Sequence, residues 1–449
     1  MKRRTFLQTA GTLVAGTTIQ AGAAIAPARN VILYITDDHG MNDAGCYGNP
    51  HVKTPGLDAL AREGVRFTHA FCTTPSCSPS RSVILTGMHN HANGQYGLAH
   101  AKHHFNSFAD VKSLPVVLGE AGYRTLCAGK VHVLPEAAYH FQEYIPGAAP
   151  VDMAEKCRPL LESKDPTPFF LYFCPTEPHR PFRREGSDVI DATKITVPPH
   201  LPDIPECRQE LAEYYASIQR ADSGLVLLMN MLRETGHWED TLIVFATDNG
   251  MPWPGAKTTL YEPGVHLPCV VRDPRNPRQG YTSNAMVSWI DIMPSILEYC
   301  GATANTCHGR SFLDAARAET AAEWDEVYHS HTFHEVTMYY PMRAVRTRRH
   351  KLIWNIAHGL PFPFASDLWQ SKTWQGVRAR GLTAYGKRTV EAYERRPEFE
   401  LYDLEADPHE IQNLAENPQL ATLLADLKHR IRAMQEKTND PWLLKWDRE

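Results

Sequence analysis

The segment CSPSRSVILTG places a cysteine at the start of a short apolar stretch. We expect a helix here, with Pro79 at its first position, where a missing N–H costs no hydrogen bond, and Gly87 at its end. Cys77 then lies at the positive end of the helix dipole, and Arg81 lies four residues on, on the same face. Such an arrangement can hold an anion beside a reactive group. The competing interpretation is a free cysteine in an ordinary buried helix.

Two pairs of oxygen-bearing side chains follow two apolar runs of the sequence. Asp37 and Asp38 come directly after NVILYIT, and Asp248 and Asn249 come directly after TLIVFAT. Carboxylate and amide oxygens suit a hard cation such as Ca²⁺ or Mg²⁺, whereas Zn²⁺ favours histidine or cysteine. Either pair alone is explained as readily by the start of a turn. Two such pairs in one fold predict a metal site.

The elements that must position these residues alternate along the chain. The runs NVILYIT, PFFLYFC and TLIVFAT predict strands buried on both faces of a parallel sheet. Helical patterns lie between them, so the sequence predicts an α/β fold whose mostly parallel sheet is sandwiched by helices. In such sheets the active site gathers at the carboxyl ends of the strands. Besides the two acidic pairs, those ends carry Lys130, His132 and His179.

After about residue 320 the pattern changes. Segments 339–356 and 398–415 are typical of antiparallel strands, the second with a turn at Asp407-Pro408, and an amphipathic helix follows Asn417. No flexible linker precedes this part of the chain. We therefore expect a catalytic domain over residues 27–320 and a smaller antiparallel C-terminal subdomain, residues 321–449, packed on it.

The first 26 residues predict a signal peptide, with a basic start, a modestly apolar middle and small residues at its end. The stretch is too short and too rich in glycine and threonine for a stable membrane span. Its RRTFL segment resembles a bacterial twin-arginine signal, which exports folded proteins. We expect the mature protein to be soluble, to have no membrane span and to lie in the periplasm or outside the cell.

Composition narrows the classes of partner and metal. The chain has 449 residues, 43% of them hydrophobic, and a formal net charge of −5, which gives no general attraction to nucleic acid. Its ten cysteines show no CxxC spacing, which argues against a structural zinc site. Histidines cluster at 100–104 and 329–334, but without an HExxH helix we favour surface or pocket roles over zinc binding.

The motif CSPSR followed by LTG resembles the signature of the sulfatases. The resemblance implies an alkaline-phosphatase-like fold in which Cys77 is oxidised to formylglycine by a dedicated formylglycine-generating machinery. It also implies a Ca²⁺ site whose ligands are Asp37, Asp38, Asp248 and Asn249 together with Cys77 in its formylglycine form. The remaining active-site positions of that family fall on Arg81, Lys130, His132, His179 and Lys257.

The family's mechanism implies a role for each of these residues. The metal and Arg81 would activate one hydroxyl of the hydrated aldehyde, while Lys130 and Lys257 stabilise charge on the sulfonyl oxygens. His179 would protonate the leaving group. His132 would deprotonate the second hydroxyl, so that sulfate leaves.

Segments outside the common core, such as HHFNSF and HEVTMYYPMR, are similar to heparan N-sulfatases. This resemblance implies removal of N-linked sulfate from glucosamine in heparan sulfate or heparin fragments. His334, Glu335 and Arg343 are candidates for the sugar pocket, and an ion pair at a strand end explains them nearly as well. The alternatives are an O-sulfatase on another sulfated glycan, a phosphoester or phosphonate hydrolase of the same fold, or a non-catalytic glycan-binding protein.

Overall fold

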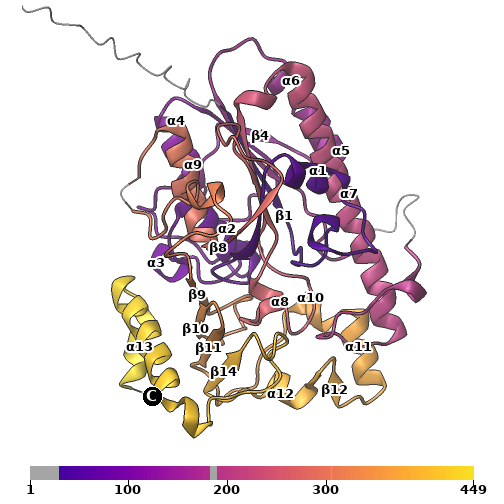
Figure 1. Cartoon of the computed structure of the whole chain (residues 1–449), viewed down its shortest axis with the longest axis vertical. Coiled ribbons are helices and arrows are strands. Elements are labelled where there is room, and N and C mark those ends of the chain that lie inside the picture. The colour runs from indigo at the N-terminus through magenta and orange to yellow at the C-terminus, as the bar shows by residue number, and fades with distance from the viewer. Residues whose placement is uncertain (1–29, 183–189, 305, 449) are drawn as a thin grey trace, which may run out of the picture.

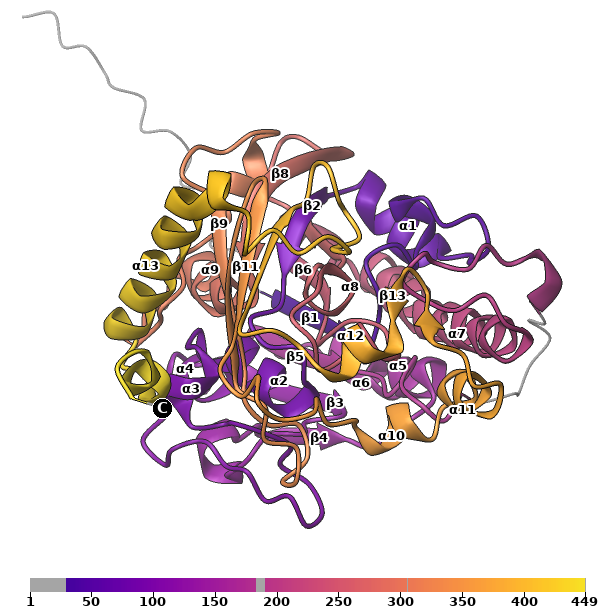
Figure 2. The same ribbon diagram turned by 90° about the horizontal axis from the view of Figure 1, so that it is seen from below.

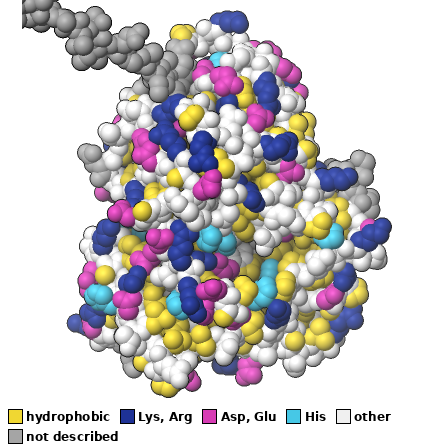
Figure 3. All heavy atoms as spheres, viewed as in Figure 1, with side chains coloured by type: hydrophobic (Ala, Val, Ile, Leu, Met, Phe, Trp, Pro, Cys, Tyr) yellow, Lys and Arg dark blue, Asp and Glu magenta, His cyan; other side chains and the backbone are white. Residues whose placement is uncertain are grey.

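The computed structural model of the chain describes residues 30–182, 190–304 and 306–448. The expected signal peptide, residues 1–26, lies outside these residues. Figure 1 shows a large sheet flanked by helices and, below it, a smaller sheet beside the C-terminal helix. On the face drawn in Figure 3, basic and acidic side chains are intermixed. No helix in the described part of the chain is long and apolar enough to cross a bilayer.

The large sheet has the strand order β4-β3-β5-β1-β6-β7-β2-β8. Every pair of neighbours is parallel except the two pairs that β7 makes with β6 and β2. The sheet is therefore mostly parallel, which confirms the predicted fold class. The strands are β1 (Asn30–Thr36), β2 (Val65–Phe71), β3 (Arg124–Gly129), β4 (Glu143–Ile145), β5 (Phe169–Cys174), β6 (Thr241–Thr247), β7 (Cys269–Arg272) and β8 (Tyr281–Ser288).

Helices cover both faces of this sheet. Along β1, Val31 and Leu33 join the core beneath α2, α4 and α9, whereas Ile32 and Tyr34 join the core beneath α1, α5 and α7. Since successive residues of a strand point to opposite faces, a continuous apolar run fits a sheet buried on both sides. Figure 2 shows the two helical layers from below. The helices are α1 (Pro55–Arg62), α2 (Cys77–Thr86), α3 (Asn90–Asn93), α4 (Leu114–Glu120), α5 (Pro150–Lys156), α6 (Arg158–Leu161), α7 (Pro205–Thr235), α8 (Glu262–Val265) and α9 (Ile292–Cys300).

Helix α2 begins at Cys77, so Pro79 is its third residue. The sequence analysis had predicted Pro79 at the first position, and this was wrong. Proline is tolerated there because the N–H groups of the first turn have no partner within the helix. Gly87 ends the helix with φ 63°, in the left-handed region that favours glycine. All ten residues of α2 are buried. All ten cysteines of the chain are described, and each is a free thiol.

The C-terminal part contains an antiparallel sheet of order β14-β11-β10-β9, against which α13 packs through Leu427 and Ile431. The prediction of a second strand after the turn at Asp407-Pro408 was wrong. The Asp407 carboxylate accepts hydrogen bonds from the N–H groups of Ile411 and Gln412, and these bonds hold the chain in a turn. The division at residue 320 stays a prediction. The remaining elements are β9 (Glu326–His331), β10 (Met342–Thr347), β11 (His350–Asn355), α10 (Ser366–Trp369), α11 (Lys372–Ala379), β12 (Ala384–Tyr385), β13 (Arg388–Thr389), α12 (Val390–Glu394), β14 (Phe399–Asp403) and α13 (Ala421–Lys437).

Candidate active site

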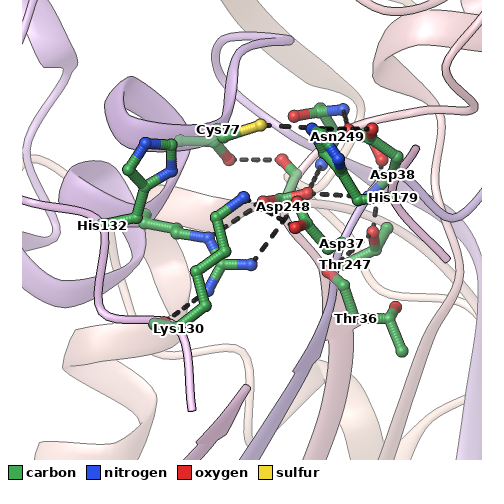
Figure 4. A network of polar contacts seen from close by, with 12 residues as sticks. Thr36, Asp37, Asp38, Cys77, Lys130, His132, His179, Thr247, Asp248 and Asn249 are labelled. Carbon is green, nitrogen blue, oxygen red and sulfur yellow. Dashed lines mark hydrogen bonds and ion pairs between the residues drawn. The ribbon is translucent and has the colours of Figure 1, made fainter. Parts of the chain in front are cut away.

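Four adjacent parallel strands, in the order β3-β5-β1-β6, deliver the predicted site residues to one edge of the large sheet. Because their carboxyl ends meet, side chains that are far apart in sequence come together there. Helix α2 points its N-terminus at the same place, as Figure 4 shows. The residues just beyond the strand ends are Lys130 and His132, His179, Asp37 and Asp38, and Asp248 and Asn249.

A compact acidic cluster forms the floor of the site. One ligand atom each from Asp37, Asp38, Cys77 and Asp248 lie within 4.8 Å of one another, and all four residues are buried. The Asn249 amide donates to Asp38 Oδ1 at 2.6 Å, while its own Oδ1 is buried without a hydrogen-bond partner, as is Asp37 Oδ1. Buried polar atoms are normally satisfied. Unpartnered oxygens in a set of oxygen donors fit a hard cation such as Ca²⁺ or Mg²⁺.

Three cationic side chains pair with the acidic cluster: Lys130, Lys257 and Arg81. Lys130 Nζ lies 2.6 Å from Asp37 Oδ2, and Lys257 Nζ lies 2.9 Å from Asp38 Oδ2. Burial opposes ionisation of Asp37, but the charges of Lys130, His179 and Arg81 together outweigh burial and lower the pKa of Asp37 to about 2. Burial, reinforced by the charge of Asp37, raises the pKa of Asp248. A bound cation would favour the ionised form of that carboxyl.

The Cys77 thiol is buried, with its Sγ 3.9 Å from Asp38 Oδ1. Burial raises the pKa of this thiol well above its ordinary value, although the charges of Lys130 and Lys257 oppose that effect. A cysteine that acts as a nucleophile needs its thiolate form. Unmodified Cys77 is therefore poorly suited to attack a substrate itself.

Two histidines lie on different sides of the cluster in Figure 4. His179 Nε2 is 3.7 Å from Asp38 Oδ2, and the other ring nitrogen contacts the backbone carbonyl of Arg180. His132 contacts the ring of His100 through Nε2. Burial, together with the charge of Lys130, keeps the pKa of His132 well below its ordinary value. The His132 ring is therefore neutral.

Asp367, on α10, is a charged residue of this site that the sequence analysis missed. Its Oδ2 lies 2.9 Å from Lys257 Nζ and 4.0 Å from His179 Nε2. Burial opposes its ionisation, but Lys257, His334 and His179 together outweigh burial and hold the pKa of Asp367 well below its usual range. No strand end and no motif marks this residue in the sequence. Only the packing of the C-terminal part against the large sheet reveals it.

The three residues predicted to form a sugar pocket, His334, Glu335 and Arg343, do not lie in one place in the structure. The His334 ring is hydrogen-bonded to Ser76 Oγ at 2.8 Å, directly before Cys77. Glu335 accepts a hydrogen bond from the backbone N–H of Ser366, the first residue of α10. Both therefore touch segments that build the site.

Arg343 has a different environment. Its guanidinium is buried and bonded to the carboxylate of Asp440, with one contact of 2.8 Å. The structure does not bring Arg343 into the acidic cluster. It instead joins β10 to the segment that follows α13.

Comparison with known proteins assigns the chain to a family. The Sulfatase family profile matches residues 29–302. The chain belongs to the sulfatase family. A second profile, "N-sulphoglucosamine sulphohydrolase, C-terminal", matches residues 255–359 of this sulfatase.

Individual relatives of this sulfatase cover nearly its whole length. Human N-sulphoglucosamine sulphohydrolase is 38% identical, covering 94% of this chain and 93% of the human one. An ulvan-active sulfatase of Formosa agariphila is 29% identical, covering 89% of this chain and 78% of the relative.

Solved structures support the fold of this sulfatase. One, described as a complex with D-glucosamine-2-N,6-O-disulfate, has a TM-score of 0.69 at 19% identity and covers 92% of this chain and 99% of its own. Phosphonate monoester hydrolase of Agrobacterium radiobacter has a TM-score of 0.71 at 18% identity, with coverages of 91% and 96%. At these identities the likeness concerns the fold alone.

Proposed function

We propose that this sulfatase removes the N-linked sulfate from glucosamine residues of heparan sulfate or heparin fragments. The observation that carries the proposal is the 38% identity to human N-sulphoglucosamine sulphohydrolase over nearly the full length of both chains. The matching C-terminal profile, which extends beyond the Sulfatase profile to residue 359, also supports it. An O-sulfatase on another sulfated glycan is the second candidate, and the similarity to the ulvan-active sulfatase favours it.

The proposed site needs two groups that the polypeptide does not supply directly. Formylglycine, made from Cys77, and Ca²⁺, held by Asp37, Asp38, Asp248 and Asn249, would supply an oxygen nucleophile and a positive charge for the sulfonyl oxygens. The unpartnered oxygens of the acidic cluster fit such a cation.

The side chains around the cluster bind and orient the sulfate group. Lys130 and Lys257 provide ammonium groups beside the buried acidic cluster, where few water molecules weaken their attraction for an anion. Arg81 fixes the Asp248 carboxylate through a contact of 2.9 Å from its Nε atom. These residues stabilise charge that develops on the sulfonyl oxygens.

Two histidines move protons in the proposed reaction. His179 is partly exposed beside the buried cluster, so it can donate a proton to the leaving nitrogen. His132 is neutral and can accept a proton when sulfate is released. Their separate positions in Figure 4 suit these opposite tasks.

The proposal includes export and modification of the chain. The RRTFL segment and the small residues that follow it support a twin-arginine signal and a periplasmic or extracellular location. The cell must also provide machinery that converts Cys77 into formylglycine. Sulfated glycosaminoglycan oligosaccharides would be the substrates.

The experiment uses the purified mature protein from a host that makes formylglycine. Sulfate or phosphate release is measured from N-sulfoglucosamine, an aryl sulfate and an aryl phosphate, and the peptide that contains Cys77 is examined by mass spectrometry. We expect the aldehyde at position 77 and release of sulfate from N-sulfoglucosamine.

Two variants complete this experiment. Cys77→Ala should abolish turnover and keep the fold, whereas Cys72→Ala, at another buried thiol, should keep turnover. Turnover by Cys77→Ala would contradict the mechanism. Wild-type activity confined to the aryl substrates would contradict the assignment of N-sulfoglucosamine.

A further inference from the structure

Asp367 is a partly exposed carboxylate beside the acidic cluster that the mechanism above does not use. The Asp367 and His179 side chains are 21% and 29% exposed, whereas those of Asp38 and Lys257 are 0% and 1% exposed. Asp367 and His179 therefore lie on the solvent side of the buried cluster. Their closest atoms are 4.0 Å apart.

This position fixes which part of a substrate can meet Asp367. A sulfate group is small enough to reach the buried cations, but a sugar ring must stay on the solvent side. The atom that bridges sugar and sulfur then lies beside His179 and Asp367. The sulfonyl oxygens carry negative charge, which repels a nearby carboxylate. Asp367 accepts one hydrogen bond from Lys257 Nζ, and its remaining lone pairs can accept another from a donor beside the sulfonyl group.

We propose that Asp367 recognises the N–H group of the sulfamate and so favours N-sulfated over O-sulfated substrates. This inference rests on the proposed function. A sulfamate, R–NH–SO₃⁻, carries a hydrogen on its bridging atom, whereas a sulfate ester, R–O–SO₃⁻, carries none. A carboxylate can accept a hydrogen bond only from the first.

The products strengthen this argument. Hydrolysis follows R–NH–SO₃⁻ + H₂O → R–NH₃⁺ + SO₄²⁻, in which the N–S bond breaks, nitrogen keeps the electron pair and gains two protons, and the water oxygen joins sulfur. The nitrogen beside Asp367 therefore becomes a cation. A carboxylate stabilises an ammonium group through an ion pair, whereas a leaving alcohol offers it only a hydrogen bond from an uncharged donor.

A purely structural role for Asp367 makes a different prediction. Its contact of 2.9 Å with Lys257 could serve only to hold that ammonium in place. Losing it would then impair the binding of every sulfate group. Product inhibition separates the two roles, because glucosamine reports on the amine side and inorganic sulfate reports on the Lys257 side.

The test compares the full-length mature enzyme with Asp367→Asn, which keeps the shape and removes the charge. We expect kcat/KM on N-sulfoglucosamine to fall roughly 10- to 100-fold, the range for a lost hydrogen bond to a charged group. Inhibition by glucosamine should weaken by a similar factor. Inhibition by sulfate, and turnover of an aryl sulfate, should change by less than about 3-fold, because Lys257 keeps its pair with Asp38 and neither molecule has a donor on a bridging atom.

A matched control is Asp325→Asn, since the exposed Asp325, just before β9, pairs with Arg348 in the turn between β10 and β11. This variant should leave all four measurements unchanged. Equal losses for glucosamine and sulfate, or unchanged kinetics, would overturn the role of Asp367 while wild-type turnover of N-sulfoglucosamine still supports the proposed function. Absence of that wild-type turnover would overturn both.

Discussion

Arg81 and Asp248 form a buried ion pair, with Arg81 Nε 2.9 Å from Asp248 Oδ2 and both side chains 0% exposed. The pair joins the first turns of α2 to the end of β6, so it ties the helix that carries Cys77 to the acidic cluster. Arg81 also donates to the backbone carbonyl of Lys130 at 3.0 Å. One guanidinium therefore connects three of the segments that build the site.

Arg81→Met should lower the free energy of unfolding of the metal-free protein by about 3–5 kcal/mol, because it leaves the buried Asp248 carboxylate without its ion-pair partner. Urea denaturation in the presence of a chelator measures this. Arg432→Met removes an exposed pair with Asp447 and should change stability by less than about 1 kcal/mol. Equal, small losses for both variants would show that the buried pair does not stabilise the fold.

Removal of a ligand charge should weaken cation binding. Asp37→Asn and Asp248→Asn each take one formal charge from the cluster, so we expect a weaker Ca²⁺ affinity and activity lower by orders of magnitude. Calorimetric titration and turnover assays measure both, with the exposed Asp426→Asn as control.

Ca²⁺ should also stabilise the wild-type fold, by about 2.7 kcal/mol when its concentration is 100 times Kd. The stability of Asp248→Asn should respond less to the same concentration. Full activity of both cluster variants after exhaustive chelation would mean that the acidic cluster holds no metal.

The leaving group decides how much the proton from His179 matters. An amine must be protonated to leave, whereas an aryl sulfate leaves as a stable phenolate. His179→Ala should therefore cost N-sulfoglucosamine hydrolysis roughly 10²–10⁴-fold more than aryl sulfate hydrolysis. Measurement of kcat/KM on both substrates tests this, and Cys77→Ala, which should abolish both, is the reference. Equal losses would make His179 a sulfate-binding residue.

His329, on β9, should make the fold sensitive to acid. Burial, helped by the charge of Lys351, lowers the pKa of His329 from 6.5 to about 3, so below pH 6.5 the unfolded chain binds a proton that the folded chain does not. Stability then falls as the pH falls from about 6.5 towards 3. At pH 5 the loss is about 2 kcal/mol, at 1.36 kcal/mol per pH unit.

His329→Gln removes that proton site and should reduce the difference in unfolding free energy between pH 7 and pH 5 by about 2 kcal/mol. Denaturant unfolding at the two pH values measures the difference. His429→Gln, at an exposed position of α13, should leave it unchanged. The same pH dependence in wild type and His329→Gln would refute the assignment.

Local sequence patterns predicted the parts of the site that depend on strand ends. Asp37 and Asp248 each follow a continuous apolar run, and such runs indicate strands buried on both faces. Strands that are parallel and adjacent must bring their ends together, so the acidic cluster follows from the positions of these runs in the chain. The position of Arg81 beside Cys77 could also be predicted from the sequence, because one helix carries both residues.

Residues outside such patterns could not be placed from the sequence. Arg343 and His334 lie in the same segment, HEVTMYYPMR, which resembles heparan N-sulfatases. Arg343 nevertheless pairs with Asp440, whereas His334 is hydrogen-bonded to Ser76. Which partner a charged side chain finds depends on segments that fold against it from far along the chain. The curled backbone after Asp407 was missed for a related reason, since a side-chain cap competed with strand pairing there.

The sequence by itself determined the α/β class, the acidic strand ends and the position of Cys77 at the head of a helix, because periodicity and helix-end chemistry are local. Tertiary structure alone decided that Asp367, 110 residues beyond Lys257, shares its ammonium with Asp38. That contact forms across the boundary between the large sheet and the C-terminal part, where the approach of two packed surfaces brings residues together. No local pattern encodes such an approach, because its energy comes from burial summed over many side chains.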